Sequence, residues 1–525
     1  MTSKNSLRSR RYFLNSLVGV TVGLPTALSK ALSCEAGGFR RLVTSFPGWF
    51  EGGGAEAHSA EGALEFDSSD TTLVRGFQWA KGQALAYVRD GDPVGPWYEA
   101  SLPGRNAFCM RDVSHMSTGA HFLGLGVRTR NMLHRFAEHI SASKQWCTWW
   151  EITREGKPAP VDYNNDHDFW YDLPANFDVL DTCYRQWLWT RDDAYLDDIF
   201  LNYYRRTVTD YVEQWDHNKD GLLEHLPQYG HMGIGTYDED LANDVLVGAD
   251  LIAAQYAAYC CYAGFQRARN QDAVAKEFTA KADALKSLYN RDWWDASSNS
   301  YRAALGEDGT FHKDLKASTG RGDIEFPLYY GLTESGPKTR ASLDVLEKCL
   351  QLDEAAIDGV IGGVEGRSYL PDLFYKYGRS QSGYTALVAM MNPILKRREY
   401  PEVSYTVIGN LGSGLMGIRP SPNSEAIETY PQLNSDTGWA AMHHVPAGNN
   451  VVSIRHTENR ETTLSNERGP AIAWRASFPG NANSIFMDGK RIPAENAARM
   501  GGTVETWHVL EVGPGETRVA SLKGA

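Results

Sequence analysis

The chain has 525 residues, which is too long for one small core and predicts a large domain with one or two smaller parts. Its net charge of −13 excludes nucleic acid as the expected partner, because phosphate binding needs a basic surface. The aromatic content is high, with 15 Trp, 26 Tyr and 19 Phe, and suits either a helical core rich in aromatics or a carbohydrate-binding cleft.

The N-terminus carries the pattern of an export signal. Arg10-Arg11 precedes an uncharged apolar run over residues 14–24, and small residues follow it. This pattern resembles a twin-arginine signal peptide over residues 1–33, and the apolar run is too short for a permanent membrane span. We therefore expect a periplasmic or secreted bacterial protein, with a lipid anchor at Cys34 as the less favoured alternative.

A Gly-rich segment over residues 34–70, in which strands are possible, leads into apolar positions with helical spacing. Short turns join the predicted helices into pairs, and long loops separate one pair from the next. The predicted helices are 73–89, 113–126, 129–143, 176–190, 193–215, 241–268, 271–290, 324–332, 338–351, 369–378, 380–391 and 403–416, with a short one at 437–443.

Helices joined by short turns become antiparallel neighbours. Six such pairs over residues 71–444, closed into a ring, place all the long loops at one end, above the N-termini of the inner helices. The sequence therefore predicts a mainly α protein with an (α/α)6 six-hairpin toroid. An open α-solenoid is the alternative, but solenoid repeats are self-similar in sequence, and this chain shows no such repeat.

The pattern changes after Val445. Short runs of alternating apolar and polar residues are separated by turn sequences such as Asp488-Gly489-Lys490. They predict a small antiparallel β-sandwich over residues 445–525. We expect this domain to be structural, because its turns carry no cluster of acids.

Candidate site residues recur in the long loops. The stretch Pro103–Asp112 runs into a helix N-terminus, which suits binding of a polar ligand. A single loop acid is more often a helix cap or a solvated side chain, but acids recur with aromatic residues at one end of the predicted toroid.

Cys/His metal spacing and cofactor motifs are absent from the sequence, so we expect neither a metal nor a cofactor. The candidate binding residues are Arg105, Arg111, Asp112, His115, Trp170, His225, Tyr237, Arg367 and Tyr430.

Paired carboxylates are what cleavage of a glycosidic bond requires. One carboxyl group must stay protonated to donate to the leaving oxygen, and the other must activate water or attack the sugar. Aromatic neighbours raise the pKa of the acid by desolvation and also stack on the sugar. The candidate catalytic acids are Glu224, Asp238, Glu365 and Glu428.

Over residues 40–525 the order of elements resembles the six-hairpin glycoside hydrolases. The segment from Glu425 to Trp439 is similar to a Glu-x-Tyr…Thr-Gly…Trp segment that carries the catalytic base in some of those families. The resemblance implies that Glu428 is the base, with Asp238 or Glu224 as the acid, and that the reaction inverts the anomeric carbon.

Three further segments resemble α-L-rhamnosidase-like and β-glucuronidase-like members of this group. They are Pro103–Asp112, Val364–Pro371 and Lys396–Val403. These members imply Asp112 or Glu365 as alternative catalytic residues.

The expected function is an exported, exo-acting glycoside hydrolase that removes a terminal sugar from an oligosaccharide or polysaccharide. Arg105, Arg111 and Arg367 can bind a uronate carboxylate, although helix capping and ion pairing are equally common roles for arginine. One alternative is a polysaccharide lyase that uses His115, His231 or Tyr237. A non-catalytic glycan-binding protein is the other.

Overall fold

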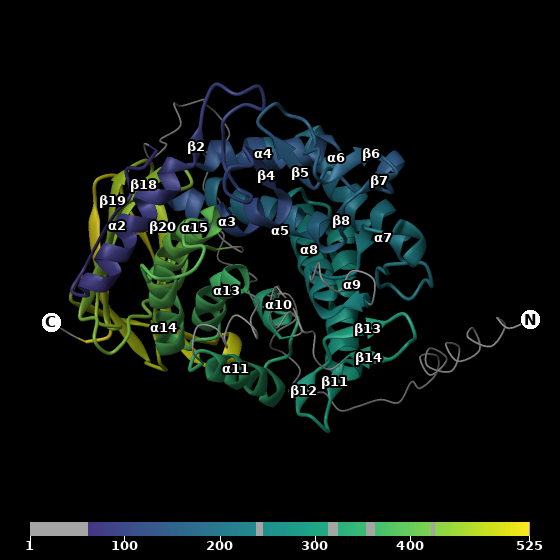
Figure 1. The fold of residues 1–525 in the computed structure, drawn as a ribbon. Coiled ribbons are helices and arrows are strands. Elements are labelled where there is room, and N and C mark those ends of the chain that lie inside the picture. The colour runs from purple at the N-terminus through teal and green to yellow at the C-terminus, as the bar shows by residue number, and fades with distance from the viewer. Residues whose placement is uncertain (1–60, 238–244, 313–323, 353–362, 422–425, 524–525) are drawn as a thin grey trace, which may run out of the picture.

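The computed structural model describes residues 61–237, 245–312, 324–352, 363–421 and 426–523. A ring of helices occupies most of the molecule, and a two-sheet β-domain lies beside the ring (Figure 1). The predicted twin-arginine signal and Cys34 lie outside the described residues. In the part of the chain described, no helix combines the length and apolar content needed to cross a bilayer.

Six inner helices form the wall of the ring. Each contacts the next in chain order, and the last contacts the first, so the ring is closed. Closure confirms the predicted toroid and rules out the open solenoid. The inner helices are α3 (Met110–Phe122), α5 (Pro174–Thr190), α8 (Ala249–Ala268), α10 (Glu325–Tyr329), α13 (Gly363–Lys376) and α15 (Pro401–Gly409), which continues as the π-helix η6 (Asn410–Leu415).

The outer helices cover the inner ones and are amphipathic. In α6 the aromatic side chains of Phe200, Tyr203 and Tyr204 are buried against the ring, whereas every residue of the inner helix α15 is buried. The outer helices are α2 (Thr71–Ala86), α4 (Gly126–Glu138), α6 (Asp198–Val208), α7 (Asp210–Trp215), α9 (Asp272–Asp292), α11 (Pro337–Cys349) and α14 (Ser380–Met391).

Helices α3 and α15 approach closely at Gly119. A Cβ atom at this position would lie 1.9 Å from the backbone oxygen of Tyr405. We expect Gly119→Ala to lower the free energy of unfolding by about 1–3 kcal/mol, because the two backbones must separate. Gly82→Ala is the matched control on the exposed side of α2, where a Cβ meets no atom within 4 Å, and should raise stability by about 0.5–1 kcal/mol. Urea denaturation of both variants tests this, and an undiminished midpoint for Gly119→Ala would contradict it.

The β-domain contains a seven-stranded sheet in the order β1-β17-β18-β19-β25-β21-β22 and a five-stranded sheet in the order β15-β16-β20-β24-β23. Pairing is antiparallel except between β16 and β20. The strands are β1 (Glu65–Ser68), β15 (Arg419–Pro420), β16 (Ala426–Thr429), β17 (Trp439–Ala447), β18 (Asn450–Thr457), β19 (Glu461–Arg468), β20 (Ile472–Pro479), β21 (Ser484–Met487), β22 (Lys490–Pro493), β23 (Glu495–Ala498), β24 (Val504–Val512) and β25 (Thr517–Ser521).

Short strand pairs occupy the long loops between helix pairs. They are β2 (Val88–Arg89) with β3 (Trp97–Tyr98), β4 (Ala107–Cys109) with β5 (Glu151–Thr153), β6 (Tyr163–Asn165) with β7 (Asp168–Phe169), β8 (Tyr171–Asp172) with β9 (Met232–Ile234), β11 (Trp294–Asp295) with β12 (Ser300–Tyr301), and β10 (Val245–Gly248) with β13 (Ala304–Gly306) and β14 (Phe311–His312). Three pairings, β4–β5, β8–β9 and β10–β13, join one loop to the next at the N-terminal ends of the inner helices, and the others are hairpins within one loop.

Three predicted helical segments are wrong in detail. Residues 439–443 of the predicted helix at 437–443 lie in strand β17, because pairing with β1 and β18 overrides the helix propensity of its alanines. Residues 245–248, predicted as the start of a helix, form β10. The helix predicted over 193–215 is broken at Thr209, whose hydroxyl bonds back to the carbonyl of Arg205.

Candidate active site

A cavity of about 400 Å³ lies at the N-terminal ends of the inner helices α3, α13 and α15. The strand pair β4–β5 brings the loop before α3 beside the loop after β5, with Cys109 opposite Glu151. Residues from four separate parts of the chain therefore meet in one place. The lining residues are Ser101, Leu102, Arg105, Cys109, Arg111, Asp112, Trp150, Glu151, Asp162, Trp170, Glu365, Arg397 and Tyr400.

Arg105 lies between two carboxyl groups on one wall of the cavity. Its Nη1 atom is 2.5 Å from Glu151 Oε2 and 3.8 Å from Asp162 Oδ2. Burial, followed by the adjacent Glu151 side chain, raises the pKa of Asp162 to about 7. This wall therefore combines one guanidinium group with two acidic side chains, of which Asp162 is partly protonated near neutral pH.

Asp112 lies in the first turn of α3 and is buried. It accepts a hydrogen bond from the hydroxyl group of Tyr400, the residue that precedes α15. Burial is the main reason that its pKa rises to about 7, and the charge of Glu402 adds to the effect. Asp112 can therefore hold a proton at neutral pH and give it to a bound molecule.

Glu365 has a different environment in the first turn of α13. Its Oε1 atom is 2.6 Å from Nη2 of Arg397, and the partial positive charge of the helix N-terminus also favours a carboxylate there. An ion-paired carboxylate accepts protons. The cavity thus holds one buried carboxyl group with a raised pKa, Asp112, and a second acidic group, Glu365, in an ion pair, an arrangement that suits an acid and a base.

A second pair of side chains lies directly behind this cavity. His115 Nδ1, one turn after Asp112, is 2.5 Å from Glu402 Oε1, and the His115 ring stacks on Tyr369 with centroids 3.5 Å apart. Burial lowers the pKa of His115 to about 3, while burial and then the charge of Glu365 raise the pKa of Glu402 to about 8. Near pH 7 the pair is neutral overall and links α3 to α15.

Five of the side chains predicted from the sequence line this cavity. They are Arg105, Arg111, Asp112, Trp170 and Glu365. His115 contributes through Glu402, behind the cavity wall. The stretch Pro103–Asp112 therefore supplies two of the arginines that line the cavity, Arg105 and Arg111, and one of the two differing carboxyl groups, Asp112.

The structure places the predicted base Glu428 in the β-domain, where the segment predicted as a loop forms β16. Glu428 Oε1 is 2.8 Å from Arg475 Nη1 and 2.7 Å from Arg499 Nη1, and both arginines also pair with Glu505. The ring of Tyr430, a predicted binding residue, also contacts Arg499, whose guanidinium carbon lies 4.1 Å from the centroid of the Tyr430 ring. Neither Glu428 nor Tyr430 is among the described lining residues of the cavity.

The other predicted residues are buried elsewhere or lie outside the described chain. Glu224 accepts hydrogen bonds from the backbone and side chain of Asn218, and His225 Nδ1 bonds to the carbonyl of Gly233. Arg367 is buried in α13, two residues after Glu365. Tyr237 is also buried, and its hydroxyl group donates to Asp178. Asp238 lies outside the described residues.

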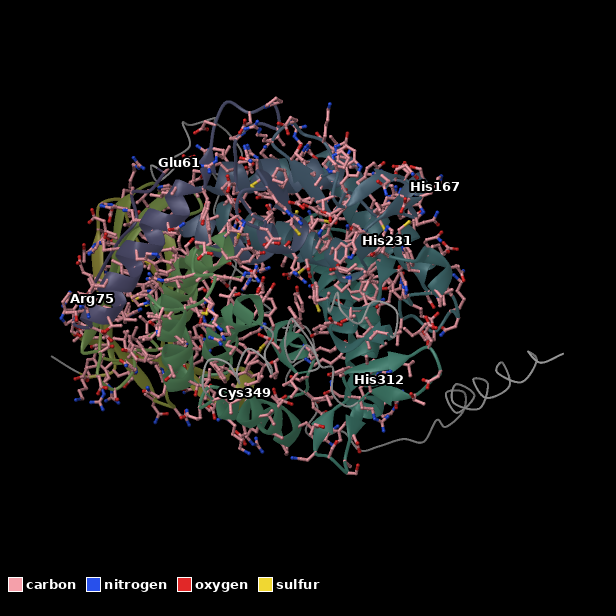
Figure 2. All side chains as sticks on the ribbon, viewed as in Figure 1. Glu61, Arg75, His167, His231, His312 and Cys349 are labelled. Atoms are coloured by element: carbon pink, nitrogen blue, oxygen red, sulfur yellow. The ribbon has the colours of Figure 1, made fainter. Side chains whose placement is uncertain are left out.

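His231, proposed for the lyase alternative, directly precedes β9 and lies in the right-hand part of the ring in Figure 2. Its Nε2 atom is 3.1 Å from Asp168 Oδ1, and its side chain is 54% exposed. It does not belong to the described lining of the cavity.

Several lining or supporting residues were not among the predicted candidates. Arg397, Tyr400 and Glu402 lie in the segment Lys396–Val403, whose resemblance to known glycosidases was a usable signal. Trp150 and Glu151 carried no such signal, because only the β4–β5 pairing brings them to the cavity.

No protein-family model and no curated protein matches this chain. Solved structures are similar in fold. The α-L-rhamnosidase from Dictyoglumus thermophilum superposes with a TM-score of 0.57 at 13% identity, over 88% of this chain and 50% of that one. The Streptomyces avermitilis α-L-rhamnosidase complexed with L-rhamnose gives 0.53 at 12% identity, over 87% and 42%. A human-microbiome protein named as a kojibiose phosphorylase gives 0.54 at 10% identity, over 86% and 60%.

These similarities confirm the predicted fold class, an (α/α)6 toroid of the kind found in glycoside hydrolases, with a β-domain. The chain spans about half the length of these solved structures. At identities this low they establish the fold, whereas the reaction has to be argued from the cavity.

Proposed function

We propose that the protein is an exo-acting glycoside hydrolase in which Asp112 is the general acid and Glu365 is the general base. The observation that carries the proposal is one cavity that holds a buried, partly protonated carboxyl group and an ion-paired carboxylate. The toroid fold, which the chain has in common with solved α-L-rhamnosidases, supports this class of reaction.

In the proposed reaction Asp112 donates its proton to the glycosidic oxygen as the bond from that oxygen to the anomeric carbon breaks. Glu365 accepts a proton from the water molecule that forms the new bond to the anomeric carbon. The indole of Trp170 offers an apolar face for a sugar ring. Attack by water on the opposite face inverts the anomeric carbon, so the first-formed product should be the opposite anomer, which NMR detects.

The proposed substrate carries a terminal uronic acid. Three arginines, Arg105, Arg111 and Arg397, line the cavity, and guanidinium groups pair with carboxylates in a bidentate geometry. The cavity volume of about 400 Å³ is near the lower end of the range for small-molecule sites, which suits one or two sugar units rather than a long chain.

The test compares 4-nitrophenyl β-D-glucuronide with the corresponding neutral glucoside and rhamnoside. We expect release of nitrophenol from the glucuronide at a kcat/KM at least about tenfold above that for the neutral substrates, since one ion pair lost in a shielded site costs at least that factor. Turnover of the neutral rhamnoside alone would contradict the uronate specificity and leave the hydrolase assignment intact.

A polysaccharide lyase would instead produce an unsaturated, ultraviolet-absorbing sugar. Among the described lining residues Tyr400 is the one Tyr or His side chain, and its hydroxyl group donates to Asp112. Burial raises the pKa of Tyr400 well above 10, so its hydroxyl group keeps its proton near neutral pH and cannot accept another from a substrate. We therefore favour hydrolysis over the lyase reaction.

We also propose that the twin-arginine signal exports the protein. Cell fractionation of an Arg10-Arg11→Lys-Lys variant would test this.

A further inference from the structure

Tyr237 is buried and contacts Arg111, one of the arginines that line the cavity. The Nη1 atom of Arg111 donates to the backbone carbonyl of Tyr237 at 3.3 Å. The guanidinium carbon also lies 5.5 Å from the centroid of the Tyr237 ring, within the range of a cation–π contact. Two parts of one residue therefore fix the direction of the Arg111 side chain.

Tyr237 is itself held by carboxyl groups from two inner helices. Its backbone N–H donates to Asp250 Oδ2 at 2.7 Å, in the first turn of α8, and the hydroxyl group of Thr236 donates to the same oxygen at 2.8 Å. Its hydroxyl group donates to Asp178 Oδ1 on α5. The backbone and the ring of Tyr237 are thus fixed by separate contacts.

Asp178 has a second phenol partner. The hydroxyl group of Tyr330, which follows α10, donates to the same Oδ1 atom at 2.5 Å. Asp178 is 2% exposed and is not among the described lining residues of the cavity. It therefore has no route to direct contact with a sugar held there, and any effect on binding must pass through its neighbours.

We infer that Asp178 is a positioning residue that sets the preference of the cavity for an anionic sugar, by fixing Tyr237 and, through it, the Arg111 guanidinium. The inference rests on the proposed recognition of a uronate by the cavity arginines. An arginine side chain has several rotatable bonds, and a guanidinium already pointed at the ligand loses less entropy on binding. A neutral sugar makes no ion pair with Arg111 and should not sense this arrangement.

The decisive variant is Tyr237→Phe, which removes the hydroxyl bond to Asp178 and keeps the ring and the carbonyl that contact Arg111. Tyr330→Phe is its matched control, because it removes the other phenol from the same Asp178 oxygen, while the hydrogen bond and the ring contact described above for Arg111 are both made to Tyr237. Both variants and Asp178→Ala are first compared with the wild type by thermal unfolding. The substrates are 4-nitrophenyl β-D-glucuronide and the corresponding glucoside.

For Tyr237→Phe and Asp178→Ala we expect KM for the glucuronide to rise about tenfold to a hundredfold, with kcat changed less than about threefold. KM for the glucoside should stay the same. Tyr330→Phe should leave both substrates unchanged. In the Arg111→Ala background, Tyr237→Phe should cause no further loss, because the two changes remove one interaction.

Three results would overturn the inference. KM could rise equally for the glucuronide and the glucoside, or Tyr330→Phe could raise KM for the glucuronide as much as Tyr237→Phe does. The losses could also be additive in the variant that combines Arg111→Ala with Tyr237→Phe. If the wild type hydrolyses neither substrate, the proposed hydrolysis of a uronate glycoside fails, and calorimetric titration with D-glucuronate decides the inference by itself. It then survives only if the wild type binds D-glucuronate at least about tenfold more tightly than Tyr237→Phe.

Discussion

Asp112→Asn and Glu365→Gln should each lower kcat on a natural glycoside by about 10²–10⁴-fold, the range that a positioned acid or base contributes. Asp112 holds the proton that the leaving oxygen needs, because the side chain is buried and lies near Glu402. In the proposed reaction Glu365, which pairs with Arg397 at 2.6 Å, accepts the proton from water. Steady-state kinetics of purified variants measure both effects.

The two roles can be separated with leaving groups of different acidity. A nitrophenolate departs without protonation, so Asp112→Asn should lose far less activity on a 4-nitrophenyl glycoside than on an alkyl glycoside. Glu365→Gln should lose activity equally on both, since every substrate needs activated water. The reverse pattern would exchange the two roles, and unchanged turnover in both variants would exclude this cavity as the catalytic centre.

Glu428→Gln tests the base implied by the family resemblance. In the structure Glu428 pairs with Arg475 and Arg499 in the β-domain. We therefore expect its replacement to lower the thermal midpoint clearly and to lower kcat only slightly. A loss of kcat as large as that of Glu365→Gln, with an unchanged thermal midpoint, would return the catalytic base to Glu428.

The second large effect is on pH dependence. Because Asp112 must be protonated to act as the acid, kcat/KM should fall as the pH rises above about 7, reaching tenfold per pH unit. The groups acting on this carboxyl are Glu402, which raises its pKa, and Arg111, Tyr400 and Cys109, which lower it. The pKa of Glu402 is itself about 8, so its negative charge grows as the pH rises through this range, and that charge favours the protonated form of Asp112.

Glu402→Gln should therefore move the alkaline limb of the profile to lower pH by up to about one unit, because it removes the negative charge that develops on Glu402 while Asp112 titrates. Glu399→Gln is the matched control, since this exposed side chain lies three residues earlier in the same segment. The measurement is the pH profile of kcat/KM for the wild type and both variants. A limb that stays in place for Glu402→Gln, or moves equally for Glu399→Gln, would contradict this account of Asp112.

Much of the fold was predictable because it follows from local periodicity. The spacing of apolar residues identified the inner and outer helices, and the unequal loop lengths predicted which end of the ring carries the site. The errors occurred where distant pairing competes with local propensity. In β17 the alanines at 440 and 441 favour a helix locally, but the strand buries them between β1 and β18.

The candidate site was predictable in part. Arg105, Arg111 and Asp112 occur together in one loop beside a helix N-terminus, so sequence alone marked them as a binding wall. The choice among acids depended on environment. Glu365 and Glu428 are both loop-region glutamates in the sequence, yet the first lines the cavity and the second lies in an ion-pair cluster of the β-domain.

The sequence by itself determined a toroid of helix pairs, a β-domain and a polar loop that leads into the first inner helix, since these features depend on residues close together in the chain. Only the tertiary structure decided which acids share a cavity and which neighbours surround each of them. Strand pairing brings Glu151 beside Arg105, and ring closure brings Tyr400 and Glu402 beside Asp112. The pKa of Asp112 depends on that burial and on those neighbours, which lie almost 300 positions away in the chain.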